Sequence, residues 1–175
     1  MNLTMCDNAV GIHFAQATAQ DASKLLEYLK RVGGESDNLS FGSEGLPFSV
    51  DAEAALLQSR WNSEDDLQLL AMVGSEIIGI ASLSRLSRRM SHRGTFAISV
   101  RKDFWGQGIG SALTSRVLSF ARAHRFEQID LEVRSDNFRA IHLYQKFGFQ
   151  KLCTYPGFFK VRGKKIDFDL MYLTI

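Results

Sequence analysis

Glycines at alternate positions mark the segment Trp105-Gly106-Gln107-Gly108-Ile109-Gly110-Ser111, which lies between a predicted strand and a predicted helix. Because glycine has no side chain, such a turn leaves backbone N–H groups uncovered at the start of the helix. These donors and the positive end of the helix dipole favour a bound anion, above all a phosphate. The segment therefore predicts a pyrophosphate site, and a glycine-rich turn without a ligand is the alternative.

Two well-known phosphate-binding loops fit this segment poorly. A Walker-type loop requires Lys-Ser or Lys-Thr after its last glycine, whereas Gly110 is followed by Ser111-Ala112. A dinucleotide-binding fingerprint accommodates Gly106 and Gly108, but its third glycine position falls on Ser111. The turn also follows several predicted hairpin strands instead of opening the chain. Both loops are therefore disfavoured.

Groups that can transfer protons follow the turn. Apolar residues alternate at strand spacing around Glu132, which lies on the opposite, polar face of its strand. In the helix predicted next, Asn137, Ile141 and Tyr144 have the spacing i, i+4 and i+7 and share one face. The structural alternatives are an exposed strand carboxylate for Glu132, a helix N-cap for Asn137 and a buried core residue for Tyr144.

The periodicity of the apolar residues predicts the elements that position these groups. Helices are expected over residues 22–32, ended by Gly33-Gly34; from an N-cap at Asp51 toward Trp61; over residues 109–124; and over residues 137–147, ended by Gly148. Strands are expected over residues 12–15, 67–73, 77–86, 95–100, 129–133, 150–161 and 165–173. With no linker or repeat, the sequence predicts one α+β domain over residues 1–175, with a mixed, mainly antiparallel sheet flanked by helices.

An irregular stretch separates the first two predicted helices. It is rich in Ser, Gly, Asp and Asn and carries apolar residues that would anchor a loop over a site: Leu39, Phe41, Leu46 and Phe48. Phe41 would line an acceptor pocket or simply pin the loop, and Glu44 is a candidate for receiving an ammonium group. Five carboxylates in this region would attract a cationic amine or would be solvated: Glu35, Asp37, Glu44, Asp51 and Glu53.

The composition limits the classes of partner. The 175 residues include 21 basic and 19 acidic side chains, and a formal charge of +2 is too balanced to argue for nucleic acid or an anionic membrane. Basic residues at positions 85–93 are expected at a solvated hairpin tip, with a phosphate-contacting patch as the alternative. Cys6 and Cys153 give no disulfide framework, the histidines have no metal-binding spacing, and residues 1–7 lack a secretory signal. We therefore expect a cytoplasmic protein without a metal.

Three runs in the second half of the chain are diagnostic when taken together: Gln107-Gly108-Ile109-Gly110-Ser111-Ala112-Leu113, then Leu131-Glu132-Val133-Arg134, then Asn137-Phe138-Arg139-Ala140-Ile141-His142-Leu143-Tyr144-Gln145-Lys146-Phe147-Gly148-Phe149. With them, residues 95–152 resemble the GNAT superfamily of acyl-CoA-dependent N-acetyltransferases. The resemblance implies a GNAT-like fold and transfer of an acetyl group from acetyl-CoA to a primary amine of a small molecule or peptide, in a ternary complex. It also makes a homodimer plausible. The alternative from another class is an acyl-CoA-binding sensor without turnover.

The resemblance implies roles for individual residues. Tyr144 would face the sulfur of coenzyme A. Glu132 lies in a string similar to that of bacterial ribosomal-protein N-terminal acetyltransferases and would serve as the base. Trp105 departs from the family, which usually has Gln or Arg there. The residues implied to contact coenzyme A are Ile98, Ser99, Val100, Gly106, Gln107, Gly108, Ile109, Gly110, Ser111, Asn137, Tyr144 and Lys146.

Overall fold

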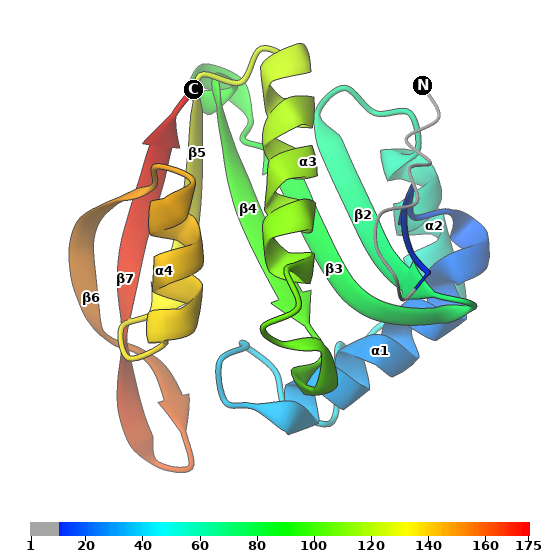
Figure 1. Ribbon diagram of the computed structural model, residues 1–175, viewed down its shortest axis with the longest axis horizontal. Helices are drawn as coiled ribbons and strands as arrows, with labels where there is room; N and C mark the ends of the chain where they lie inside the picture. The colour runs from blue at the N-terminus through cyan, green and yellow to red at the C-terminus, as the bar shows by residue number, and fades with distance from the viewer. Residues whose placement is uncertain (1–10) are drawn as a thin grey trace.

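The computed structural model describes residues 11–175, which form a seven-stranded sheet with helices on both faces (Figure 1). The strands are β1 (Ile12–Gln16), β2 (Asp66–Val73), β3 (Glu76–Arg85), β4 (Arg93–Val100), β5 (Gln128–Arg134), β6 (Gln150–Val161) and β7 (Lys164–Thr174). The helices are α1 (Ala22–Glu35), α2 (Val50–Arg60), α3 (Ile109–Ala123) and α4 (Phe138–Lys146). Cys6 and the segment inspected for a secretory signal lie outside the described residues.

The sheet has the strand order β1-β2-β3-β4-β5-β7-β6, and only β4 and β5 pair in parallel. Every strand expected from the sequence is present, and the prediction of a mixed, mainly antiparallel sheet is confirmed. Helices α3 and α4 cover one face, whereas α1 and α2 lie on the other, behind β2 and β3 in Figure 1.

Two hydrophobic cores hold these layers together. Helix α3 buries Ile109, Leu113 and Val117, which are spaced four residues apart, against the strands. On the opposite face, α1 buries Leu25 and Leu29 in the second core. Each such side chain contributes about 1.5–3 kcal/mol when it is fully removed from water. No helix within residues 11–175 combines the length and the apolar character needed to cross a bilayer.

The sheet opens between its two central strands. Pairing of β4 with β5 is restricted to Arg93–Thr95 against Gln128–Asp130, while β4 pairs with β3 as far as Val100. Beyond Thr95 the two parallel strands part. The backbone groups on this side of β4 therefore face a gap in the sheet instead of a neighbouring strand.

Two expected helix ends differ in the structure. Helix α1 continues through Gly33 and Gly34 to Glu35, because the following loop crosses this part of the helix: a Cβ on Gly33 would lie 2.0 Å from the carbonyl oxygen of Gly42. Glycine serves here for close approach and does not end the helix. At α2 the N-cap is Ser49, whose hydroxyl accepts a hydrogen bond from the Ala52 amide, and not the predicted Asp51.

The basic residues at positions 85–93 extend from the last residue of β3, Arg85, to the first residue of β4, Arg93. Arg85 pairs with Asp65 and lies over the ring of Phe126, and Arg93 pairs with Asp130. These contacts engage the two arginines within the fold, so the cluster is not wholly a solvated tip.

The C-terminal hairpin of β6 and β7 is anchored by one buried carboxylate. Asp169 on β7 accepts hydrogen bonds from Ser135 at 2.7 Å and Thr154 at 2.9 Å and pairs with Lys151 at 2.8 Å. Burial raises the pKa of Asp169, but the hydrogen bonds from Lys151, Ser135 and Thr154 outweigh it and hold the pKa below its usual range. Asp169 therefore ties the hairpin to the connection between β5 and α4.

Candidate active site

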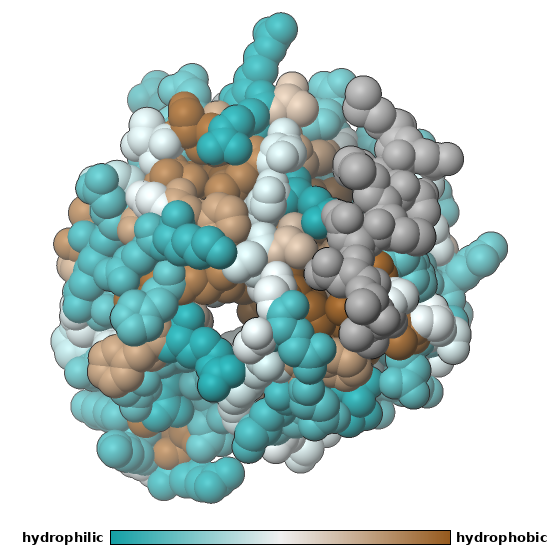
Figure 2. Space-filling view, viewed as in Figure 1, coloured by the Kyte–Doolittle hydropathy of each residue, from teal (hydrophilic) through white to brown (hydrophobic). Residues whose placement is uncertain are grey.

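A cavity of about 860 Å³ lies where β4 and β5 part. Its lining comes from β4, the glycine turn, α4, the end of β5, the loop after α1 and the C-terminal hairpin. Figure 2 shows an opening through this face of the molecule, between α4 and the N-terminal end of α3. Segments that are far apart in the sequence thus line one space.

The glycine turn presents six consecutive amides. Gly106 and Gly108 have φ of 78° and 83°, and a Cβ at either position would meet no protein atom within 4 Å. The first helical hydrogen bond runs from the Ala112 amide to the Gly108 carbonyl, and the N–H groups of residues 106–111 donate to no group within residues 11–175. The turn is therefore an array of donors at the positive end of α3.

Side chains around the turn hold it and add positive charge. The Trp105 indole N–H donates to the Val100 carbonyl at 2.7 Å, and the Arg139 guanidinium lies 4.7 Å from the centre of the Trp105 ring. Trp105, the residue at which this chain departs from the usual Gln or Arg of the family, thus attaches the turn to β4. Lys146 Nζ lies 3.4 Å from Ser111 Oγ. The structure therefore brings a cation from α4 to the first turn of α3.

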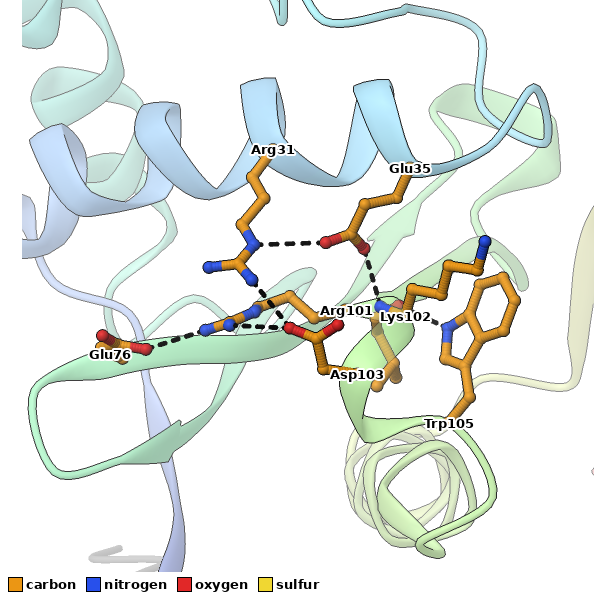
Figure 3. A network of polar contacts seen from close by, with 8 residues as sticks. Arg31, Glu35, Glu76, Arg101, Lys102, Asp103 and Trp105 are labelled. Atoms are coloured by element: carbon orange, nitrogen blue, oxygen red, sulfur yellow. Dashed lines mark hydrogen bonds and ion pairs between the residues drawn. The ribbon is translucent and has the colours of Figure 1, made fainter.

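A network of ion pairs connects α1 to the segment that leads into the turn (Figure 3). The buried Arg101 pairs with Glu76 at 2.8 Å and with Asp103 at 3.3 Å. Arg31 on α1 pairs with the same Asp103 at 2.8 Å and with Glu35 at 3.2 Å. Glu35 also accepts a hydrogen bond from the Lys102 amide at 2.7 Å. The end of α1, the start of β3 and residues 101–103 are therefore held together.

The register of β4 decides which of its backbone groups face the gap. The Arg101 amide bonds to Ile78 and the Leu86 amide to Arg93, so odd-numbered residues of β4 direct their backbone groups to β3. Ile98 and Val100 consequently direct theirs to the gap, although the Val100 carbonyl is already bonded to Trp105. The amide and carbonyl of Ser99 are used within the sheet.

The side chain of Ser99 has a partner of its own. Its hydroxyl lies 3.0 Å from the hydroxyl of Tyr28, a buried residue of α1. Burial raises the pKa of Tyr28, partly offset by the hydrogen bond with Ser99, so Tyr28 is a neutral phenol. This pair joins α1 to the cavity-lining part of β4.

Tyr144 lines the cavity from α4 and is only 6% exposed. Its ring meets Phe96 edge-on with centroids 6.1 Å apart and lies 5.8 Å from the Phe149 ring. Burial raises the pKa of the phenol well above its ordinary value. Within the described part of the chain its hydroxyl has no hydrogen-bond partner. A neutral donor is thus held in an aromatic setting at the cavity wall.

Two further predicted residues line the same cavity. Asn137 caps α4, accepting a hydrogen bond from the Ala140 amide at 3.3 Å, so the structural alternative given for this residue is confirmed. Glu132 on β5 is exposed to the cavity, and within residues 11–175 it has no ion pair. Ile141, expected on the ligand face of α4, instead packs against the core, and Ala140 takes its place in the lining.

The loop residues Phe41 and Glu44 line a second, smaller cavity of about 440 Å³. Phe41 packs against the second core, and Glu44 accepts a hydrogen bond from the Gly42 amide at 2.7 Å. That hydrogen bond lowers the pKa of Glu44. The two cavities adjoin and share Ser36, Leu39, Ser40, Phe158 and Phe159. Their roles toward an acceptor remain predictions.

Sequence analysis missed an aromatic wall of the larger cavity. Phe158 and Phe159 from β6 and Phe168 from β7 all line it. The available signal was Pro156-Gly157 within an expected strand, because such a pair breaks regular strand pairing. Among residues 11–175, no group of three or more His, Cys, Asp or Glu side chains is arranged to hold a metal ion.

Comparison with curated proteins finds acetyltransferases. The N-alpha-acetyltransferase RimI of Mycobacterium tuberculosis is 35% identical over 94 residues, which are 53% of this chain and 58% of that protein. Human N-acetyltransferase 8B is 29% identical over 112 residues, covering 64% of this chain and 46% of that protein. The chain thus spans about half the length of these relatives.

Solved structures and a family model give a wider match. An acetyltransferase of the GNAT family from Streptococcus pneumoniae superposes with a TM-score of 0.90 at 29% identity, covering 94% of this chain and 99% of that one. YncA of Salmonella typhimurium, solved with its cofactor acetyl-CoA, has the same fold, with a TM-score of 0.81 at 19% identity over 93% of each chain. The model of the acetyltransferase (GNAT) family matches residues 37–149, well over half of the sequence. This chain therefore belongs to the GNAT acetyltransferase family.

Proposed function

We propose that this chain transfers the acetyl group of acetyl-CoA to a primary amine by direct attack in a ternary complex. The observation that carries the proposal is the set of six backbone N–H groups, those of residues 106–111, that donate no hydrogen bond within residues 11–175. Residues of this turn line the same cavity as Tyr144 and Glu132. A donor array suits a diphosphate, while a phenol and a carboxylate on the walls suit the two proton movements that acyl transfer requires.

The residues present fit coenzyme A along its length. The amides of the turn would bind the diphosphate, with Lys146 next to Ser111 adding a cation. Ile98 and Val100 would offer backbone groups to the pantetheine amides across the gap between β4 and β5. The side chain of Asn137, which lines the cavity at the start of α4, would also contact this arm.

The chemical step is an exchange of one bond for another. The lone pair of the amine nitrogen attacks the thioester carbon, the C–N bond forms, and the C–S bond breaks with its electron pair going to sulfur. The nitrogen loses one proton, for which Glu132 is the proposed acceptor. A backbone N–H on the open side of β4 would meet the developing oxyanion. The sulfur leaves as thiolate or thiol.

The two proton movements differ in difficulty. An alkylamine with a pKa of about 10.4 costs about 4–5 kcal/mol to deprotonate at pH 7, so a base or a water chain to one is needed. A thiol has a pKa near 8.5, which lies below that of an ordinary tyrosine, and burial raises the pKa of the Tyr144 phenol further. Full proton transfer from Tyr144 to the thiolate is therefore unfavourable. Tyr144 therefore acts chiefly by hydrogen bonding to the sulfur.

The test of this function combines binding with turnover. Isothermal titration should detect acetyl-CoA binding at one site per chain, and a thiol-release assay on a panel of amines should detect free coenzyme A only when an amine is present. Binding without release on any amine would favour the acyl-CoA sensor instead. No binding at all would remove the proposed role of residues 106–111.

Replacing Glu132 with Gln is expected to lower kcat/KM for the amine about 100-fold at pH 7, since general bases contribute roughly 10²–10⁴-fold. The deficit should shrink above about pH 10, where the amine is already neutral. Asp130→Asn is the matched control, because Asp130 lies on the same strand face but pairs with Arg93 outside the cavity. A deficit that is constant with pH would exclude Glu132 as the base.

A further inference from the structure

One end of the active-site cavity has an aromatic wall. Phe158 and Phe159 have ring centroids 5.3 Å apart, and Phe168 lies 5.1 Å from the first and 4.2 Å from the second. All three line the cavity, joined by Leu39 from the loop after α1. Nothing in the proposed transfer chemistry requires three phenyl rings, so their role calls for another explanation.

The wall exists because the pairing of β6 with β7 is irregular just before Phe159. Consecutive strand residues normally point to opposite faces, yet Phe158 and Phe159 both line this cavity. Pairing of β6 with β7 is interrupted between Tyr155 and Phe159. Gly157 in this interruption has φ of +64° and donates its amide to the Asp167 carboxylate at 2.8 Å. The bulge therefore aims a second ring into the cavity.

The aromatic wall lies within reach of the proposed base. On the antiparallel pair of β5 and β7, Glu132 stands opposite Leu170, which makes Phe168 its diagonal neighbour on the same face. Diagonal neighbours of this kind are about 7–8 Å apart. An amine nitrogen at Glu132 would consequently carry its attached group against the rings.

The charges at this end are also specific. Arg134 lines the cavity, but all three of its guanidinium nitrogens already donate, two to Asp136 and one to the Asp37 carbonyl. Glu132 has no ion pair within residues 11–175. At this end the larger cavity thus offers the carboxylate of Glu132 and apolar surface, and the Arg134 guanidinium is already paired with Asp136, which disfavours an acceptor carrying a carboxylate. Lys160 and Arg162 line only the smaller, adjoining cavity.

We propose that the acceptor is a primary amine bearing an apolar group about the size of a phenyl ring and no carboxylate beside the nitrogen. This inference rests on the proposed function and names the substrate class of that site. Two sources share this chemistry: a free arylalkylamine, and a peptide-like amine whose carboxyl group is an amide.

The test compares four acceptors at saturating acetyl-CoA: phenethylamine, phenylalaninamide, phenylalanine and putrescine. We expect kcat/KM for phenethylamine or phenylalaninamide to exceed that for phenylalanine and for putrescine at least tenfold, as a well-formed apolar pocket discriminates by about 10–200-fold. The order of the first two distinguishes the two sources. Faster turnover of putrescine or phenylalanine would overturn the inference about the acceptor and leave the acetyltransferase function intact. Release of thiol without any amine would instead contradict the acetyltransferase function.

Variants link the preference to the wall. Phe158→Ala should lower the ratio of kcat/KM for phenethylamine over putrescine about tenfold or more. Tyr155→Ala is the matched control, because this exposed ring adjoins Phe158 but does not line the cavity, and it should keep the wild-type ratio within about threefold. Phe159→Ala is the second variant should Phe158→Ala melt at a lower temperature. An unchanged ratio in both phenylalanine variants would contradict the proposal.

Discussion

The substitution Gly108→Val is expected to raise the KM for acetyl-CoA at least about 100-fold, or about 2.7 kcal/mol in binding. At φ of +83° any residue other than glycine is strained by about 1–2 kcal/mol. A Cβ at Gly108 would also meet no protein atom within 4 Å, and Gly108 lines the cavity, so the valine side chain would take up space proposed for the diphosphate. Distortion of the turn and obstruction by the side chain should therefore both weaken the binding of acetyl-CoA.

Gly74→Val separates this effect from general strain. Gly74 lies in the β2–β3 turn with φ of +57°, and a Cβ there also meets no atom within 4 Å. Both variants should lower the melting temperature by a similar amount, but only Gly108→Val should change the KM for acetyl-CoA. Steady-state kinetics on both variants provide the measurement. Equal KM values for Gly108→Val and the wild type would disprove the diphosphate site.

Removing the hydroxyl of Tyr144 by substitution with Phe is expected to lower kcat about 100-fold and to leave the KM for acetyl-CoA within about twofold. The phenol has no hydrogen-bond partner in the part of the chain described, so its loss strands no other polar group, and the ring contacts with Phe96 and Phe149 persist. The effect should therefore fall on the leaving thiolate and not on folding.

The pH profile of the wild type supplies a second readout for Tyr144. Since burial raises the pKa of this phenol, the protonated donor persists well above pH 10, and no falling limb from its ionisation should appear below that pH. Tyr172→Phe is the control: it removes a hydroxyl that donates to Gln150 on the neighbouring strand, outside the cavity. Tyr144→Phe with wild-type turnover would leave the phenol without a role in the reaction.

Local sequence was enough to predict most elements and the glycine turn. Alternation of apolar residues gives each strand its buried face, and the spacing of Ile109, Leu113 and Val117 gives α3 its buried face. Gly106 and Gly108 have positive φ, which glycine adopts without strain because it has no Cβ. Such features depend on neighbours in the chain, which the sequence displays directly.

Other features depend on contacts between distant segments. Gly33 resembles a helix end by its residue type, but the crossing of residue 42 makes it a packing position inside α1. Ile141 and Ala140 are equally plausible on the ligand face by spacing, and the packing of α4 on the sheet selects Ala140. The roles of Gly33 and Ala140 are thus set by contacts with residues about ten or more positions away in the sequence or on another element.

The sequence by itself determined the family, the sheet, the glycine turn with its N–H donors, and Tyr144 and Glu132 as candidate catalytic residues. Each of these follows from residue type and short-range spacing. Only the tertiary structure decided that β4 and β5 part after three residue pairs, that Trp105 bonds to Val100, and that a bulge turns two adjacent rings into the cavity. The physical reason is range: a dihedral preference or a periodicity is set along the chain, whereas the walls of a cavity are set by which strands pair and how far.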